Sequence, residues 1–536
     1  MYSIITVRRE PHMVKRSCKL SPGLYQFAMS SDMVPHLRYE KSCRVHHFFA
    51  LIFRSVSPCH ATWFRISDTK NPVGCTIFCL VSVCVFAACR GGKNAEFFAD
   101  PVAKRRYLQY VIREMNRAEV SFEPGRRFMS YGIRDFYAER SLSFQIGDGR
   151  ELALYECWEV VPVKVVLNSE SGLGGTVYIR LDDNAGNVRE RVFEAAEDIS
   201  FTVERTAPGF VNLLAEWKNG DQVAATLHRS IGFSVEKIQP CEAEPDDFEA
   251  FWLGLFAQAD ALPDEVRMIP VPDRETEQTK LYELHVPTLN NRTIYGYVSV
   301  PKAEGKFPIM ICYPGSGPAS GEQQWLRYED AITLFMNVHS YPYKPGETQE
   351  ETIARAGYDA FDYATIGIES RDTYVYHDVM PAMHRAVRFV QTLPEYDGEN
   401  LGVFGSSQGG WLSIMTAAFH PEVKAVCANV PAFTQIDGFL SVRTEMAKHE
   451  DDPAYQARVR ETLRYYSSAF AAKRIKAKVA VIVGRIDHVC PPTGIYAMFN
   501  ALAGKKKICH EMDMKHECRA SWSEGIQALR DYLTGR

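Results

Sequence analysis

The segment Asn400–Phe419 constrains the fold of this chain more than any other stretch. It reads NLGVFGSSQGGWLSIMTAAF: a short apolar run, a turn of small residues, and an apolar segment containing alanine. This order predicts a strand, a tight turn and a helix, with Ser407 at the turn between Gly405 and Gly409. Glycine is favoured there because the serine backbone is strained and the helix must start close to the strand. The pattern therefore predicts an exposed serine nucleophile, with a glycine-rich connection that carries no chemistry as the alternative.

The segments around this turn predict a mostly parallel sheet. Phe307–Tyr313 and Lys478–Val483 are near-continuous apolar runs, which are typical of strands buried on both faces. The apolar spacing in Asp378–Leu393 predicts a helix directly before the serine-bearing strand, and Ser521–Leu533 predicts a closing helix. We therefore expect an α/β-hydrolase fold over residues 237–536, in which helices flank a mostly parallel sheet.

A serine hydroxyl needs a base that takes its proton, and the base needs an acid that orients it. In an α/β-hydrolase these residues follow in the order serine, acid, histidine. Asp487 comes just after the Lys478–Val483 run, at the sheet edge that carries Ser407, and His516 lies in a loop further on. A turn or cap aspartate is the alternative for Asp487. We prefer His516 as the base over four other histidines: His377, His384, His488 and His510.

Two backbone N–H groups are expected to face the serine and form an oxyanion hole. One belongs to Gln408, which follows Ser407 directly. The other should come from the loop Pro314–Gly317, which follows the Phe307–Tyr313 run, because an α/β-hydrolase donates its second N–H from a loop at that point.

Residues 118–236 have the texture of a β domain. Short runs rich in β-branched and aromatic residues alternate with turn signals such as Asn219-Gly220-Asp221. The runs that we expect to be strands read LSFQI, WEVVPVKVVL, GTVYIRL, DISFTV, FVNLLAEW and GFSVEKI. This pattern predicts an antiparallel, all-β sandwich before the hydrolase domain. Since neither a charged cluster nor an aromatic platform stands out, a packing module is favoured over a carbohydrate-binding one.

Charge and cysteine content exclude some functions. Residues 1–70 hold 11 Lys and Arg against 4 Asp and Glu, so the remaining residues carry 50 against 62. An acidic body is a poor partner for nucleic acid, because phosphate affinity comes from clustered Lys and Arg. Seven of the 14 cysteines lie at or before Cys89, and no C-x-x-C pair occurs, so neither a zinc site nor a redox pair is expected.

Residues 76–88 form an uncharged apolar run that ends at Cys89. A helix of 13 residues at ~1.5 Å per residue cannot span a bilayer of ~30 Å, but it has the length of a signal-peptide core. We expect residues 71–89 to be a bacterial lipoprotein-type signal with Cys89 as the lipidated residue. Residues 1–70 would then be an atypical extension outside the folded domains, and residues 90–117 a linker. The protein would be exported and attached to a membrane, in the periplasm or at the cell surface. A buried internal segment is the alternative.

Three elements together resemble carbohydrate esterase family seven, the acetyl xylan esterases and cephalosporin C deacetylases. They are the Gly405–Gly410 turn (GSSQGG), the Asp487–Pro492 element (DHVCPP) and His516-Glu517. The likeness spans Asp246 to Gly535. It implies Ser407 as nucleophile, Asp487 as orienting acid and His516 as base. It also implies the N–H groups of Gln408 and Ser316 as the oxyanion hole, and a small acyl pocket.

Two segments depart from the pattern of that family. Its His-Gly-Tyr oxyanion loop is Pro314-Gly315-Ser316 here, and its Arg-Gly-Gln-Gly segment is replaced around His339–Pro342. These changes predict a divergent branch with its own acyl or alcohol preference.

The resemblance implies a serine carboxylesterase that removes acetyl or other small acyl groups from carbohydrate, without a metal or organic cofactor. A prolyl-oligopeptidase-like peptidase shares the order of the three residues. The ~120 residues of the β region are too few for its propeller, since even four blades of ~40 residues need more. An inactive surface glycan-binding protein is a second alternative, and the intact trio argues against it. The sequence leaves the oligomeric state open.

Overall fold

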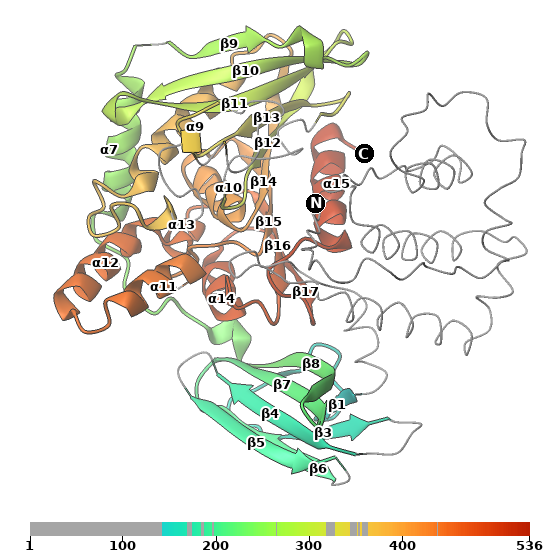
Figure 1. Cartoon of the computed structure of the whole chain (residues 1–536). Coiled ribbons are helices and arrows are strands. Elements are labelled where there is room, and N and C mark those ends of the chain that lie inside the picture. Colours follow the sequence, from blue (N-terminus) through green and yellow to red (C-terminus); the bar gives the residue numbers. More distant parts are fainter. Residues whose placement is uncertain are drawn as a thin grey trace, which may run out of the picture. The chain divides into compact units, whose positions relative to one another are not determined.

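The computed structural model describes residues 142–536 apart from 169–173, 184–186, 196–197, 264, 318–326, 343–350, 352–353, 356–362 and 437. All described residues belong to one compact unit, Gly132–Arg536. The predicted N-terminal extension, the signal segment with Cys89 and the linker lie outside the described residues. Figure 1 shows strands alone in the first part of the described chain, and a large sheet flanked by helices in the rest.

The region that precedes the large sheet consists of two smaller sheets. Its strands are β1 (Leu142–Ile146), β2 (Leu154–Tyr155), β3 (Val161–Leu167), β4 (Thr176–Asp182), β5 (Val188–Glu194), β6 (Ile199–Val203), β7 (Gly209–Asn219) and β8 (Gln222–Phe233). One sheet has the order β1-β3-β6 and the other β2-β8-β7-β4-β5; apart from the short β2–β8 pair, all pairs are antiparallel. Alternate residues of β3 and β4, such as Val163 and Ile179, meet in one core. This arrangement agrees with the predicted sandwich.

Two strands of this region differ from the sequence expectation. The run GFSVEKI is mostly not a strand, because β8 ends at Phe233 and Ser234 takes a left-handed φ of 39°. Val235–Lys237 then form a 3-10 turn, η2. The edge strand β5 was missed because its sequence, VRERVFE, is exposed along nearly its whole length and so lacks an alternating pattern.

The large sheet has nine strands in the order β17-β16-β15-β14-β12-β13-β11-β10-β9. Strands β9 to β11 pair antiparallel at one end of it, and β12 to β17 pair parallel. The strands are β9 (Arg267–Pro270), β10 (Thr279–Thr288), β11 (Arg292–Pro301), β12 (Phe307–Tyr313), β13 (Ile332–Met336), β14 (Tyr396–Ser406), β15 (Val423–Asn429), β16 (Lys478–Gly484) and β17 (Lys506–Glu511). The predicted α/β-hydrolase architecture is confirmed.

The central strands are apolar throughout because each face of the sheet has its own core. In β12, Ile309 and Ile311 pack into the larger cluster, whereas Met310 and Cys312 pack into a smaller one on the opposite face. The smaller cluster is closed by Leu529 and other residues of the last helix. This two-sided burial is the physical reason for the unbroken apolar runs.

Eight described helices accompany the sheet: α7 (Phe248–Asp260), α9 (Val379–Val390), α10 (Gln408–Phe419), α11 (Leu440–Lys448), α12 (Pro453–Tyr466), α13 (Ser468–Ala472), α14 (Pro492–Ala501) and α15 (Ala520–Thr534). Helix α15 contributes to the smaller core, while α7, α9 and α10 contribute to the larger one. Helix α10 is buried along nearly its whole length. Helix α10, which begins directly after Ser407, is therefore packed against other parts of the protein on nearly all sides.

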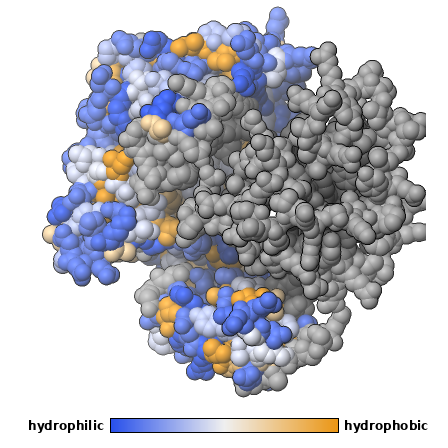
Figure 2. Space-filling model, viewed as in Figure 1, coloured by the Kyte–Doolittle hydropathy of each residue, from blue (hydrophilic) through white to orange (hydrophobic). Residues whose placement is uncertain are grey.

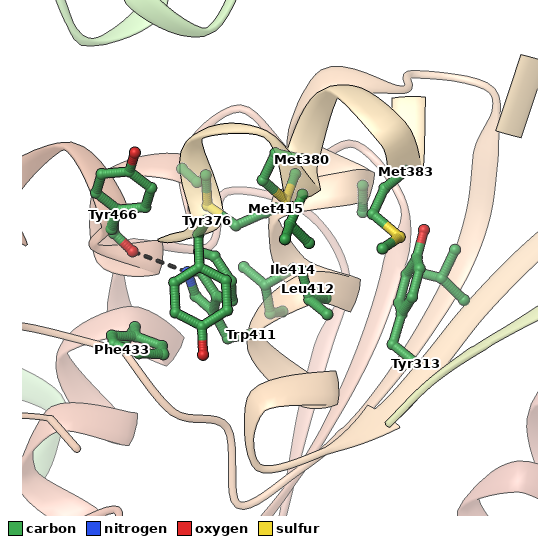
Figure 3. Packing of buried hydrophobic residues seen from close by; sticks show 14 of the residues in the cluster. Tyr313, Tyr376, Met380, Met383, Trp411, Leu412, Ile414, Met415, Phe433 and Tyr466 are labelled. Carbon is green, nitrogen blue, oxygen red and sulfur yellow. Dashed lines mark hydrogen bonds between the residues drawn. The ribbon is translucent and has the colours of Figure 1, made fainter. Parts of the chain in front are cut away.

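The side chain of Trp411 anchors α10 in the larger core (Figure 3). Its indole N–H donates a hydrogen bond of 2.8 Å to the carbonyl oxygen of Tyr466. Its ring packs against Tyr376 and Phe433, with centroid distances of 4.9 and 5.0 Å. Burial of this large ring with its one polar atom paired holds the first turn of α10 in place.

The surface in Figure 2 is mainly hydrophilic over the described residues, with separate hydrophobic patches. No helix in the described part of the chain is long and apolar enough to cross a membrane.

Candidate active site

The turn between β14 and α10 has the strained geometry that its glycines predict. Ser407 adopts φ 58° and ψ −119°, in the left-handed half of backbone space. A Cβ on Gly405 would lie 2.3 Å from the carbonyl carbon of Gly409. A Cβ on Gly409 would lie 2.2 Å from the carbonyl oxygen of Tyr313 at the end of β12. Only glycine allows these approaches, and they present the Ser407 side chain above the sheet edge.

The structure brings Ser407, His516 and Asp487 together. His516 Nε2 lies 2.8 Å from Ser407 Oγ, and His516 Nδ1 lies 2.7 Å from Asp487 Oδ2. The three residues come from three different loops, each of which follows a parallel strand: β14, β16 and β17. Since these strands are parallel, their carboxyl ends meet at one edge of the sheet, which is why residues so far apart in sequence converge.

The Asp487 carboxylate is held in place by hydrogen bonds other than the one with His516. It is 1% exposed, and its Oδ1 accepts hydrogen bonds from the N–H groups of Val489 (2.7 Å) and Cys490 (3.0 Å). Its second oxygen is left to accept from His516. A carboxylate fixed this way selects the tautomer with hydrogen on Nδ1, so that Nε2 is free to accept the serine proton.

Electrostatics favour the protonated imidazole. Burial alone lowers the pKa of His516, but Cys490 and Asp487 raise it, and the net pKa lies well above the ordinary value. Burial also raises the pKa of the Cys490 thiol, so near neutral pH this group is uncharged and acts on the imidazole through its hydrogen bond. The Asp487 carboxylate is therefore the charge that stabilises the imidazolium.

The other histidines considered have different partners. His510 faces Tyr496, with 3.0 Å between ring nitrogen and hydroxyl, and His377 contacts Asp378 at 2.8 Å. His384 lies between Asp260 and His420. The backbone carbonyl of His488 accepts a hydrogen bond from Arg443.

The loop Pro314–Gly317 lies beside the turn, as its place after β12 predicts. A Cβ on Gly409 would approach the carbonyl oxygen of Pro314 to 2.9 Å, and one on Gly315 would lie 3.7 Å from the carbonyl oxygen of Ser406. Gln408 begins α10, so its N–H is one of the unpaired donors at the helix start. Ser316 is exposed in the loop.

The side chain of Gln408 ties this loop to the protein interior, a role that the sequence did not reveal. Its Oε1 accepts hydrogen bonds from the hydroxyls of Tyr363 and Tyr376, the latter at 2.6 Å. Its Nε2 donates to the carbonyl oxygens of Pro314 (3.3 Å) and Gly315 (3.4 Å). The amide is fully buried, with two hydrogen bonds accepted by its oxygen and two donated by its nitrogen.

His339 supports the same loop from another side. Its Nε2 lies 2.8 Å from the carbonyl oxygen of Gly317, and its ring packs between those of Tyr341 and Tyr363. Burial lowers the pKa of His339 to about 4, so the ring is neutral at pH 7 and donates to that carbonyl. The segment that departs from the family pattern therefore still supports the loop beside the serine.

No cluster of His, Cys, Asp and Glu in the described ranges could hold a metal ion. A surface cavity of about 530 Å³ lies elsewhere, lined by residues such as Lys306, Asp397 and Arg536. These residues lie at the start of β12, near the start of β14 and after α15, so the cavity is at the opposite end of the strands from Ser407.

Comparison with known proteins places this chain in a family. The family model for acetyl xylan esterase (AXE1) matches residues 233–530. The acetyl esterase Axe7A of Xylanibacter ruminicola is 32% identical over 286 residues, which are 52% of this chain and 65% of that protein. The match thus spans just under two thirds of that relative.

Two solved structures are also similar. Acetyl xylan esterase 1 from Thermoanaerobacterium sp. JW/SL YS485 is 22% identical and covers 56% of this chain and 97% of its own, with a TM-score of 0.49. Acetyl xylan esterase from Paenibacillus sp. R4 is 22% identical and covers 56% and 98%, with a TM-score of 0.48. Because the family model matches more than half of its length, this chain belongs to the acetyl xylan esterase family, as its sequence motifs predicted.

Proposed function

We propose that this protein is a serine esterase that removes acetyl or other small acyl groups from carbohydrate. The observation that carries the proposal is the hydrogen-bonded series Ser407, His516 and Asp487. Membership of the acetyl xylan esterase family supports the ester substrate. The description of the family, acetyl xylan esterase, and the name of the relative Axe7A, an acetyl esterase, support acetylated carbohydrate as the substrate class.

The reaction follows from the geometry in two halves. Ser407 Oγ attacks the ester carbonyl while His516 Nε2 takes the hydroxyl proton, and the same imidazolium then gives that proton to the leaving sugar oxygen. Water, deprotonated by His516, hydrolyses the acyl-enzyme and releases the acid. The charge of Asp487 stabilises the imidazolium in both halves.

The oxyanion formed in each half needs donors opposite the serine. We assign this role to the backbone N–H of Gln408 and that of Ser316 in the neighbouring loop. Each such donor contributes about 3–4 kcal/mol to transition-state stabilisation in comparable enzymes. The bonds from Gln408 and His339 to the loop carbonyls support this assignment, because they hold the loop without using those N–H groups.

We also propose that the protein is exported and anchored through a lipidated Cys89. The support is the sequence pattern alone, an apolar run followed by Ala87-Ala88-Cys89. Mass spectrometry of the native protein should find a mature N-terminus at Cys89 that carries a lipid. A mature N-terminus upstream of Lys70 would contradict export by this signal.

A three-substrate assay tests the proposed activity. Wild type and Ser407→Ala are compared on an aryl acetate, on acetylated xylan and on a proline-containing peptide. We expect acetate release that the substitution abolishes. Cleavage of the peptide alone would establish the peptidase alternative, and binding to xylan without any hydrolysis by wild type would establish the glycan-binding one. Full esterase activity in Ser407→Ala would overturn the assignment of the nucleophile.

A further inference from the structure

The side chain of Arg485 is fully buried and connects the loop of Asp487 to the β1–β8 region. Its Nη1 donates a hydrogen bond of 2.9 Å to the carbonyl oxygen of Leu152, and its Nη2 donates one of 3.1 Å to that of Ser230. Its guanidinium carbon lies 4.9 Å from the centre of the Phe210 ring. The β1–β8 region thus surrounds a residue that stands two positions before Asp487.

Burial of the Arg485 side chain is unfavourable in free energy. Within the ranges that the structure describes it forms no ion pair, and its Nε has no hydrogen-bond partner. Burial lowers its pKa to about 10, so the group is still charged at pH 7. Its Nη1 also lies 3.5 Å from His510 Nδ1 and 3.5 Å from the Met512 sulfur, which are neutral groups as well. A buried charge held by neutral partners stabilises the fold little compared with an apolar side chain of similar size. Its position next to the site offers a better reason for its presence.

The backbone around Arg485 is bonded directly to the loop that carries the histidine. Arg485 N–H donates to the carbonyl oxygen of Glu511 (3.0 Å), and the following N–H, of Ile486, donates to that of Met514 (3.2 Å). A Cβ on Gly484 would lie 2.6 Å from the carbonyl oxygen of Lys515, so the two loops touch. Movement of Arg485 would therefore shift both Asp487 and His516 relative to Ser407.

We propose that Arg485 is a positioning residue that fastens the acid and base loops to the β1–β8 region, and that this region is thereby a working part of the active site. The proposal rests on the proposed function of the three residues. The sandwich then has a role other than that of a spacer. The carbonyl oxygens of Leu152 and Ser230 hold the guanidinium in place, and the guanidinium in turn holds the loops of Asp487 and His516.

The main test is Arg485→Met, which keeps an unbranched apolar side chain and removes the guanidinium donors. We expect kcat for an aryl acetate to fall roughly 10- to 100-fold, because small misplacements of catalytic groups have effects of that size. KM should stay within about twofold, since Arg485 is fully buried and so does not contact substrate. Arg485→Lys, which keeps one charged donor, should recover part of the lost kcat.

The pH profile gives a readout that a purely structural residue would not change. The titratable groups that act on the imidazole of His516 are Asp487 and Cys490. If the Asp487–His516 contact loosens in Arg485→Met, the pKa of His516 falls. The acid limb of the kcat/KM profile should then move to lower pH.

Two controls separate positioning from stability. Arg385 on α9 is also buried, and its guanidinium donates to the carbonyl oxygens of Ala259 (3.0 Å) and Pro263 (2.6 Å), away from both loops. Asn500 on α14 donates to the carbonyl oxygens of Val235 (2.8 Å) and Ile238 (3.0 Å), and so provides a second link to the end of the β1–β8 region. Arg385→Met and Asn500→Ala should lower the melting temperature while kcat and the acid limb stay at wild-type values.

The outcomes are distinct from those for the proposed function. If Ser407→Ala retains activity, the catalytic assignment itself fails. If Ser407→Ala is inactive but Arg485→Met shows wild-type kcat and an unmoved acid limb, this inference alone fails. It fails too if Arg485→Lys recovers none of the kcat that Arg485→Met loses. It fails as well if Arg385→Met lowers kcat and moves the limb as much as Arg485→Met does.

Discussion

The two walls of the site are held in place by different means. On the serine side, Gly405 and Gly409 flank Ser407 and make close backbone approaches that leave no room for a Cβ on either glycine. On the opposite side, the loop Pro314–Gly317 is held by side chains that come from distant parts of the chain, Gln408 and His339. The first wall depends on contacts between backbone atoms and the second on contacts made by side chains, so they should differ in what breaks them.

The loss of the acid charge should have the largest effect. Asp487→Asn keeps the shape of the side chain but favours the wrong tautomer of His516, so we expect kcat to fall about 10⁴-fold. The base must be neutral to act, so activity rises with pH through the pKa of His516. Because Asp487 raises that pKa, the acid limb should move to lower pH in the variant. The pH dependence of kcat/KM measures both changes.

Asp378→Asn is the matched control for that prediction. Asp378 is also buried and also contacts a histidine nitrogen, at 2.8 Å in His377. Its substitution should leave the acid limb where it is. A limb that moves equally in both variants would mean that a general change in charge, and not the contact with His516, sets the profile.

A methyl group at Gly409 should break the serine side next most severely. In Gly409→Ala the Cβ would meet backbone atoms of Tyr313 and Pro314, which cannot give way as a side chain can. We expect a loss of about 3 kcal/mol or more in the free energy of unfolding, and a fall of at least about 100-fold in kcat. Chemical denaturation and steady-state kinetics test this, with Gly254→Ala on α7 as control. Nothing lies within 4 Å of a Cβ there, so that variant should be neutral or more stable.

Gln408→Met should weaken the opposite wall while it leaves the backbone N–H of residue 408 in place. The hydroxyls of Tyr363 and Tyr376 would lose their acceptor, and two loop carbonyls would lose a donor. We expect a loss of about 1–3 kcal/mol in stability for each buried group left unpaired. A displaced loop donor should lower kcat roughly 10- to 100-fold. Tyr376→Phe, which removes one hydroxyl only, should show a smaller fall. Wild-type kcat in Gln408→Met would show that the loop does not need this support.

The smallest effect is the pH dependence of the loop support through His339. The pKa of His339 is about 4 in the folded protein, against an ordinary value of 6.5. Between these values the unfolded chain binds the proton and the folded protein does not, so stability is lost as pH falls from 6.5 towards 4. His339→Phe should reduce the slope of unfolding free energy against pH in this window by at most about 1.4 kcal/mol per pH unit. Equal slopes in both proteins would contradict a neutral, buried His339.

The same contrast explains what the sequence could predict. The β14–α10 turn was predictable because its glycines, strand and helix are all local, and Asp487 and His516 followed because each comes after a parallel strand. The supports of the loop Pro314–Gly317 were not predictable, because Tyr363 and Tyr376 lie far from Pro314 in sequence and read as ordinary core aromatics. Arg485 was missed for a similar reason: before Asp487 it reads as a turn residue, and its partners are backbone carbonyls, which no sequence pattern marks.

We propose Ser407 as the nucleophile and His516 as the base that activates it. A phosphonyl fluoride forms a stable bond with an activated serine, so labelling followed by peptide mass spectrometry tests the claim directly. We predict one label on the peptide that contains Ser407, absent in Ser407→Ala and strongly slowed in His516→Ala. A label on another residue, or ester hydrolysis that continues in wild type after Ser407 is fully labelled, would contradict the account.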